Sequence, residues 1–237
     1  MSELYIGIMS GTSMDGIDAA LCSISNQNSL TTIAQHSLDI TDALRNNIQS
    51  LCIQGENEIH RSRSLDIELA ELTSTLVKEL LTKQKLSASE IKAIGNHGQT
   101  IRHMPNAEKP YSLQISNPSI IANLTGITTI TDFRMADIAA GGQGAPLVPA
   151  FHHSAFAEKG KFRAIINIGG IANITILPSE NAEDIRGYDT GPGNTLLDQW
   201  AQSKQRIPFD KNGDWGRSGQ ILPELLKQLT TGKVIQY

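Results

Sequence analysis

The sequence predicts an α/β protein with mixed sheets. Three apolar runs near the N-terminus, residues 4–9, 17–24 and 30–38, are separated by turn residues, which is typical of an antiparallel meander. Further along the chain, apolar runs typical of strands alternate with segments of helical periodicity. This alternation favours α/β layers, and the opening meander indicates that the sheets are not wholly parallel.

A long helix is the most clearly marked element of the first half. Leucine recurs at helical spacing from Ser64 onward, and Asp66 and Glu68 fall in the predicted first turn. The leucines are Leu65, Leu69, Leu72, Leu76 and Leu80. Residues 87–90 then match a capping box, and a buried strand is expected over residues 91–95.

A shorter helix is predicted from the residues at its two ends. Asn117 and Pro118 have the pattern of an N-cap followed by a first helical proline, and Gly126 is typical of a helix end two turns later. A strand is expected over residues 127–131, and it leads directly to residues 132–134.

The pattern of strand, glycine turn and strand returns in the second half. Residues 164–168 and 171–177 are apolar runs separated by a glycine pair, and a helix is expected before them over residues 147–156. This internal similarity predicts two lobes with related beginnings. We place the N-terminal lobe at residues 1–146 and the start of a second lobe at residues 147–237.

Composition favours a small-molecule partner. The formal net charge is -4, with acidic and basic residues interspersed, so the chain offers no broad attractive field for nucleic acid or an anionic membrane. No segment resembles a signal peptide or a membrane span, and Cys22 and Cys52 do not form a metal-type pair. We therefore expect a cytoplasmic protein with reduced thiols.

The segment from Gly11 to Asp18 is a turn suited to binding phosphate. In order, its residues are Gly11, Thr12, Ser13, Met14, Asp15, Gly16, Ile17 and Asp18. Glycine lets backbone N–H groups converge on an anion, hydroxyls add donors, and an aspartate such as Asp15 can hold the magnesium that accompanies a nucleotide. An ordinary hairpin turn is the alternative interpretation.

Residues 11–14 are also similar to the nucleophile segment of subtilisin-like proteases, which would make Ser13 catalytic. We reject this interpretation because Asp15 stands where that family has a small residue. The segment also precedes every histidine of the chain, which reverses the protease order of aspartate, histidine and serine.

Two glycine-rich segments of the second half suit the same kind of ligand. Gly169 and Gly170 lie between apolar runs, as in a second anion-binding turn. Asp189 precedes a helix expected over residues 195–200 with Asn194 as its cap, so its carboxylate is placed to accept a proton near an anion-favouring helix end. A turn-capping role for Asp189 is the alternative.

Four polar residues follow directly after predicted apolar runs, where binding residues often gather. They are His97, Gln99, Asp132 and Arg134. Each of them, taken alone, fits a surface or hydrogen-bonded structural role better than a ligand contact. His97 and His103 lack metal-ligand spacing, and His152 and His153 are interpreted as part of an ordinary helix.

Six motifs, taken together in chain order, resemble the anhydro-N-acetylmuramic acid kinase family. They are residues 7–18, 96–103, 132–134, 141–149, 167–173 and 187–198. The resemblance runs from the N-terminus to about residue 219. It implies an actin-like ATPase fold, in which two ribonuclease H-like lobes with mixed sheets enclose a cleft, with the second lobe incomplete in this chain.

The resemblance also implies an activity and a set of site residues. The family uses ATP and Mg²⁺ to phosphorylate O6 of 1,6-anhydro-N-acetylmuramic acid while water opens the anhydro bond, which gives N-acetylmuramic acid 6-phosphate for cell-wall recycling. By matching positions, Asp189 is expected to be the general base, and residues 11–18 with Gly169 and Gly170 are expected to bind the phosphates of ATP. Asp15 is expected to hold the metal.

The sugar pocket is expected, from the same resemblance, to be lined by His97, Gln99, Asp132 and Arg134. The guanidinium of Arg134 suits either the lactyl carboxylate or the developing phosphate charge. A homodimer is expected from the resemblance alone.

Members of the family continue beyond Tyr237, through the rest of the second lobe and a glycine-rich segment that contacts adenosine. This departure keeps a second interpretation open, a sugar-binding fragment or assembly module without kinase activity. A hydrolase that uses Ser13 is the third interpretation.

Overall fold

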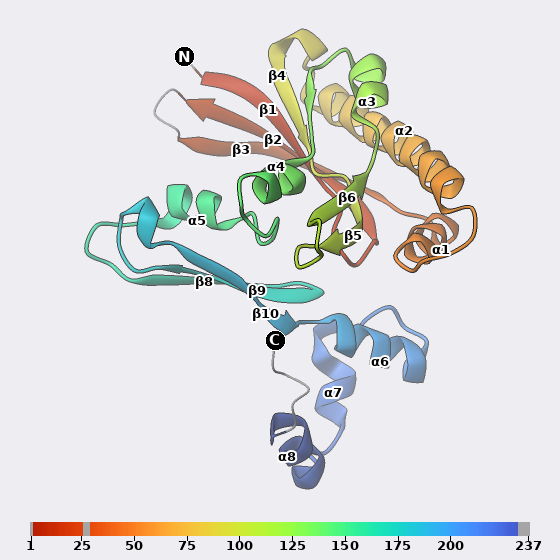
Figure 1. Ribbon diagram of the computed structural model, residues 1–237, viewed down its shortest axis with the longest axis vertical. Coiled ribbons are helices and arrows are strands. Elements are labelled where there is room, and N and C mark those ends of the chain that lie inside the picture. The colour runs from red at the N-terminus through yellow and green to blue at the C-terminus, as the bar shows by residue number, and fades with distance from the viewer. Residues whose placement is uncertain (1, 26–28, 232–237) are drawn as a thin grey trace. The chain divides into compact units, whose positions relative to one another are not determined.

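The chain divides into two compact units in the computed structural model, which describes residues 2–25 and 29–231. Unit 1 is Met1–Leu147 and unit 2 is Val148–Tyr237, and each is described by itself (Figure 1). Within the described residues, no helix is both long enough and apolar enough to cross a membrane.

Unit 1 is built on a five-stranded sheet with the order β3-β2-β1-β4-β7. The strands are β1 (Ser2–Met9), β2 (Gly16–Ser25), β3 (Leu30–Asp39), β4 (Ile91–Asn96) and β7 (Thr129–Ile130). The first three pair antiparallel, whereas β4 runs parallel to β1 and β7 runs parallel to β4. The predicted meander and the mixed sheet are confirmed, in agreement with the ribonuclease H-like lobe that the resemblance implies.

The remaining elements of unit 1 are a hairpin and five helical segments. They are β5 (Gln99–Met104), β6 (Tyr111–Ile115), α1 (Asp42–Leu51), α2 (Glu58–Gln84), η1 (Ala88–Glu90), α3 (Pro118–Thr125) and α4 (Phe133–Ala139). The two strands β5 and β6 pair antiparallel in a separate sheet. The strand expected over residues 127–131 is shorter than predicted, because only Thr129 and Ile130 join the ladder to β4.

Helix α3 forms as its end residues predict. The side-chain oxygen of Asn117 accepts hydrogen bonds from the backbone N–H groups of Ser119 and Ile120, at 3.0 and 3.3 Å. Gly126 ends the helix in the left-handed conformation, with φ of 72°, which glycine adopts without steric cost. The predicted capping box at Ser87 and Glu90 is also present.

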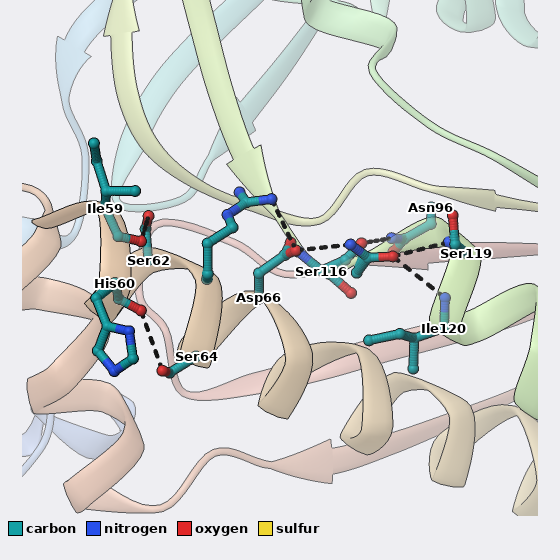
Figure 2. Close-up of polar contacts among 11 residues, drawn as sticks. Ile59, His60, Ser62, Ser64, Asp66, Asn96, Ser116, Ser119 and Ile120 are labelled. Atoms are coloured by element: carbon teal, nitrogen blue, oxygen red, sulfur yellow. Dashed lines mark hydrogen bonds and ion pairs between the residues drawn. The ribbon is translucent and has the colours of Figure 1, made fainter.

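Helix α2 begins earlier than expected, which changes the role of Asp66. Asp66 lies well inside the helix rather than in its first turn, and it is buried. Its carboxylate accepts hydrogen bonds from Ser116 N–H at 2.9 Å and Asn117 Nδ2 at 3.0 Å, and it pairs with Arg63 at 3.3 Å (Figure 2). The expectation that Asp66 acts on the helix dipole is therefore wrong, because the carboxylate instead holds the corner between β6 and α3.

The core of unit 1 lies between the sheet and α2, which packs along β2 and β3 with α3 beside it (Figure 1). Leu69, Leu76 and Leu80 are at most 1% exposed, and Ile6 and Ile94 of the sheet are equally buried. Burying each such side chain stabilises the fold by about 1.5–3 kcal/mol. The leucine periodicity therefore marks the face of α2 that joins the core.

Unit 2 contains a three-stranded antiparallel sheet with the order β10-β9-β8. Its strands are β8 (Arg163–Ile168), β9 (Ile171–Leu177) and β10 (Arg186–Pro192). Its helical segments are α5 (Pro149–Phe156), η2 (Ala182–Asp184), α6 (Thr195–Gln205), η3 (Lys211–Gly213), α7 (Asp214–Ser218) and α8 (Pro223–Thr231). The strands expected over residues 164–168 and 171–177 are present as β8 and β9, and β10 adds a third strand that the sequence pattern did not predict.

Candidate active site

The predicted phosphate turn joins β1 to β2. The carbonyl of Gly11 accepts a hydrogen bond from Met14 N–H at 3.2 Å, which closes the turn, and Met14 adopts φ of 53°. Thr12, Ser13, Asp15 and Asp18 are exposed, whereas the side chains of Met14 and Ile17 are buried in the core. The turn therefore presents hydroxyl, carboxylate and backbone groups to solvent while two apolar side chains anchor it.

Further hydrogen bonds fix the conformation of this turn. Ser13 Oγ donates to Asp15 Oδ1 at 2.6 Å, and Ser37 Oγ of β3 donates to Asp18 Oδ1 at 2.5 Å. Arg45 of α1 donates from Nε to the carbonyl of Met14 at 2.9 Å. Residues from β3 and α1 thus hold the backbone of the turn in place.

Gln99 lies beneath the turn. Its side chain is 2% exposed, and its Oε1 accepts a hydrogen bond from Ser10 Oγ at 2.6 Å. Its Nε2 donates to the carbonyl of Thr100 at 3.3 Å. Gln99 therefore connects the start of β5 to the start of the phosphate turn, and its part in sugar binding stays a prediction.

His97 and Arg134 are brought together, as expected for residues of one pocket. Arg134 Nε donates to His97 Nε2 at 2.8 Å, and Nη1 donates to the carbonyl of Gly144 at 2.6 Å. A guanidinium has no acceptor, so His97 Nε2 carries the lone pair and Nδ1 carries the proton, which it donates to Gly98 O at 2.6 Å. Burial, and then the neighbouring Arg134 charge, lower the pKa of His97 below its ordinary value.

The loop after α4 is held from both sides by that helix. Asp137 Oδ2 accepts a hydrogen bond from Gly144 N–H at 2.7 Å, and Arg134 Nη1 donates one to the carbonyl of the same glycine. Gly144 has φ of 73°, and a Cβ there would lie 3.0 Å from the carbonyl oxygen of Arg134. Asp137 was not singled out from the sequence, although its spacing of three residues from Arg134 puts both on one face of α4.

Asp132 is exposed at the start of α4.

Asp189 lines a pocket of about 300 Å³ within unit 2. The pocket is formed by the β9 and β10 ends and the start of α6, with Gly170, Ile171, Asp189, Gly191, Pro192, Thr195, Leu196 and Gln199 around it. The Asp189 side chain is exposed. Its carboxylate is therefore accessible to a small molecule, as a proton acceptor requires.

The double-glycine turn packs against the start of α6. The carbonyl of Gly170 accepts from Gly193 N–H at 2.9 Å and Thr195 Oγ1 at 2.7 Å, and the carbonyl of Gly169 accepts from Asn194 N–H at 2.8 Å. Asn194 occupies the N-cap position, but its side chain forms no cap hydrogen bond. The backbone N–H groups at the start of α6 instead donate to the carbonyls of Gly169 and Gly170. Any anion contact made by this turn must come from its N–H groups.

One polar residue near Asp189 is additional to the predicted set. Asn173 of β9 is the direct cross-strand partner of both Asn167 and Asp189, so the three side chains share one face of the sheet. Asn173 Oδ1 is buried and has no hydrogen-bond partner among the described residues. Side chains alternate along β9, so Asn173 lies on the same face as Ile171, which lines the pocket. This alternation is the sequence feature that could have indicated Asn173 as a site residue.

The described residues contain no group of three or more His, Cys, Asp and Glu side chains arranged to hold a metal ion. Magnesium in nucleotide sites usually has only one or two carboxylates, with phosphate oxygens and water as its other ligands. The exposed carboxylate of Asp15 fits that donor pattern. A metal role for Asp15 therefore stays a prediction.

Comparison with known proteins places the chain beside one family. A family model described as anhydro-N-acetylmuramic acid kinase matches residues 3–234. Curated proteins named anhydro-N-acetylmuramic acid kinase from Shewanella oneidensis and Shewanella putrefaciens are 53% and 52% identical over 225 residues, which cover 95% of this chain. The chain spans 60% of the length of these relatives.

Solved structures show weaker similarity. A PPX-GPPA enzyme of Aquifex aeolicus matches with a TM-score of 0.40 and 11% identity over 84% of this chain and 56% of that one. A reductive activator for a corrinoid, iron-sulfur protein matches with a TM-score of 0.45 and 15% identity over 81% of this chain and 31% of that one. The fold assignment rests on the strand order described above rather than on these matches.

Proposed function

We propose that this chain, which belongs to the anhydro-N-acetylmuramic acid kinase family, takes part in the ATP-dependent phosphorylation of 1,6-anhydro-N-acetylmuramic acid. The observation that carries this proposal is the exposed Asp189 carboxylate at a pocket of about 300 Å³ beside the start of α6. A pocket of this size accommodates a sugar-sized ligand. Carbohydrate phosphorylation for cell-wall recycling, in the cytoplasm where ATP is available, would be the physiological role.

Asp189 would act as the general base. The carboxylate takes a proton from water, the water oxygen bonds to C1 of the sugar, and the bond between C1 and O6 breaks. O6 then bonds to the γ-phosphorus of ATP as the bond from that phosphorus to ADP breaks, so O6 needs no separate acid. The products are N-acetylmuramic acid 6-phosphate and ADP.

Residues of unit 1 would bind and orient the substrates. The backbone N–H groups and hydroxyls of residues 11–18 suit the phosphates of ATP. Mg²⁺ held by Asp15 would neutralise phosphate charge. His97, Asp132 and Arg134 would contact the sugar, with Arg134 oriented by its hydrogen bonds to His97 and Gly144.

Asp189→Asn provides the direct test. The full chain would be incubated with the anhydro-sugar, ATP and Mg²⁺, and the 6-phosphorylated product measured by mass spectrometry. We expect the variant to lose at least about 10³-fold in rate, because an amide does not accept the proton. Glu183→Gln is the matched control, since Glu183 is an exposed carboxylate in η2, outside the pocket-lining set.

Two outcomes would count against the proposal. Full activity of Asp189→Asn would remove the carboxylate from the mechanism. Calorimetry that shows sugar binding but no nucleotide binding to the chain would favour a sugar-binding module instead of a kinase.

A further inference from the structure

A small cavity lined by both polar and apolar side chains lies beneath the phosphate turn of unit 1. It has about 10 Å³ of room for the centre of a water molecule. Polar side chains from three elements and two loops line it beside the apolar side chains of Ile8, Ile17 and Leu69, namely Ser10, Thr73, Asn96, Gln99 and Ser116. All five of these residues are at most 6% exposed, so bulk water does not solvate their polar groups.

One acceptor at this cavity has no partner. Asn96 is 1% exposed, and its Oδ1 is buried without a hydrogen-bond partner among the described residues. The orientation of the amide is fixed, because Asn96 Nδ2 donates to the carbonyl of Ser116 at 3.1 Å (Figure 2). Rotating the amide by 180° would bring two carbonyl oxygens together, so Oδ1 must remain the unpaired atom.

Other polar groups of the lining already form hydrogen bonds with one another or with Asp66. Ser10 Oγ donates to Gln99 Oε1 at 2.6 Å, and Ser116 N–H donates to Asp66 at 2.9 Å. The hydroxyls of Thr73 and Ser116 lie 3.3 Å from each other. Leaving a buried carbonyl such as that of Asn96 without a hydrogen bond costs free energy. A water molecule, with two donors and two acceptors, would donate to this oxygen and bridge it to the hydroxyls of Thr73 and Ser116.

We propose that this cavity is a binding site for one buried water molecule, which donates a hydrogen bond to Asn96 Oδ1 and completes a polar network beneath the phosphate turn. The cavity has room for a single such molecule, and the unpaired Asn96 Oδ1 in its lining distinguishes it from cavities that stay dry. No carboxylate lines it, so a metal cation is not the matching occupant.

The water adds a side-chain link between two groups of contacts whose strands, β1 and β4, already pair through their backbones. On one side, Asp66 holds Ser116, and Ser116 holds Asn96 at the end of β4 (Figure 2). On the other side, Gln99 holds Ser10, where the phosphate turn begins. The bound water thereby positions the turn against β4 and α2, and this role does not depend on the proposed function.

A crystal structure of the full chain at about 1.8 Å or better tests the proposal directly. We expect an ordered water within about 3.2 Å of Asn96 Oδ1, with at least one further protein partner. In Asn96→Leu, which removes the unpaired acceptor at similar volume, the water should be absent. A cavity without density in the wild-type structure, or a rotated Asn96 whose oxygen bonds to a protein donor, would overturn the proposal.

If Asn96→Leu does not fold, Thr73→Val provides a second variant. It removes one hydroxyl from the lining of the cavity and leaves Asn96 intact. We expect the water to remain bonded to Asn96 Oδ1 but with a lower occupancy or a shifted position. Thr75→Val is the control on the same helix, because Thr75 is exposed and bonds only to the carbonyl of Glu71. An unchanged water in Thr73→Val would contradict the bridging role.

Discussion

His97 is kept neutral by its surroundings. The Arg134 guanidinium donates to its Nε2, so protonation would remove that hydrogen bond and place two cations in contact. Burial acts in the same direction and is the larger cause of the lowered pKa. The interaction that orients Arg134 is therefore tied to the neutral state of the imidazole.

This arrangement predicts a loss of stability at acidic pH. The pKa of His97 is lower in the folded state, so the unfolded chain binds more protons once the pH falls below about 6.5. The free energy of unfolding should be highest above that pH and fall by at most about 1.4 kcal/mol per pH unit, down to the folded pKa. Urea denaturation from pH 8 to pH 5 measures it.

Two variants isolate the contribution of His97. His97→Gln keeps an acceptor for Arg134 but does not titrate, so its stability should depend less on pH than that of the wild type. His60→Gln, at an exposed histidine of α2, should follow the wild-type curve. Identical pH dependence of wild type and His97→Gln would show that His97 does not carry the effect.

At the scale of single elements, helix α2 ends on a residue in a conformation that disfavours side chains. Lys85 has φ of 56° and ψ of 38°, in the left-handed region, and it is exposed. Glycine adopts this conformation without steric cost. We expect Lys85→Gly to raise the free energy of unfolding by about 0.5–1 kcal/mol.

The matched control is a lysine on the same helix with ordinary helical geometry. Lys78 is exposed inside α2, so Lys78→Gly should lower the free energy of unfolding by about 1 kcal/mol. Both variants lose one positive charge, and thermal denaturation compares them. Destabilisation by both substitutions would mean that Lys85 does not adopt the left-handed conformation in solution.

The contact between the double-glycine turn and α6 requires a glycine at position 193. A Cβ on Gly193 would overlap the carbonyl oxygen of Gly169. That oxygen belongs to the backbone, so it cannot move aside as a flexible side chain could. Gly193→Ala should therefore separate the turn from the helix and lower the free energy of unfolding by about 1–3 kcal/mol. Gly169→Ala is the control, because its Cβ would lie 3.6 Å from the nearest atom, an ordinary contact. Equal stability of the two variants by urea denaturation would contradict this packing.

Elements with end signals or strong periodicity could be predicted from the sequence. Asn117, Pro118 and Gly126 specified α3, and the leucine spacing specified the buried face of α2. Helix α1 was not predicted, although Thr41 caps it and Leu44, Ile48 and Leu51 recur at helical spacing. The β5-β6 hairpin is not evident from the sequence, because polar residues interrupt the apolar alternation of residues 99–104.

Across the whole molecule, the polar contacts of the candidate site could not be predicted, because they join residues far apart in the chain. Asp66 bonds to Ser116, and Arg134 bonds to His97, and neither pair has a spacing that sequence periodicity detects. Only the parallel placement of β4 beside β1 brings His97 next to the turn, where its N–H bonds to Ile8 O at 3.0 Å. The sequence indicated which residues gather at strand ends, and the tertiary fold decides which of them touch.

The two units should differ in stability. Unit 1 contains a continuous cluster of buried apolar side chains, whereas Leu177 and Ala201 are the buried apolar residues among the described part of unit 2. Large side chains of unit 2 such as Ile166, Ile168 and Leu197 are more than 60% exposed. Since apolar burial is the main stabilising contribution, unit 2 should open while unit 1 remains folded.

Amide hydrogen exchange on the full chain, followed by mass spectrometry, measures this difference. We expect peptides from β1, β4 and α2 to be protected at least about tenfold more than peptides from β8, β9 and α6, because local opening exposes less apolar surface in unit 2. The β3 edge strand is an internal control, since its exposed side chains should give it lower protection than β1 within the same unit. Equal protection of β4 and β9 would indicate that the chain unfolds as one cooperative body, which the uneven distribution of buried side chains does not predict.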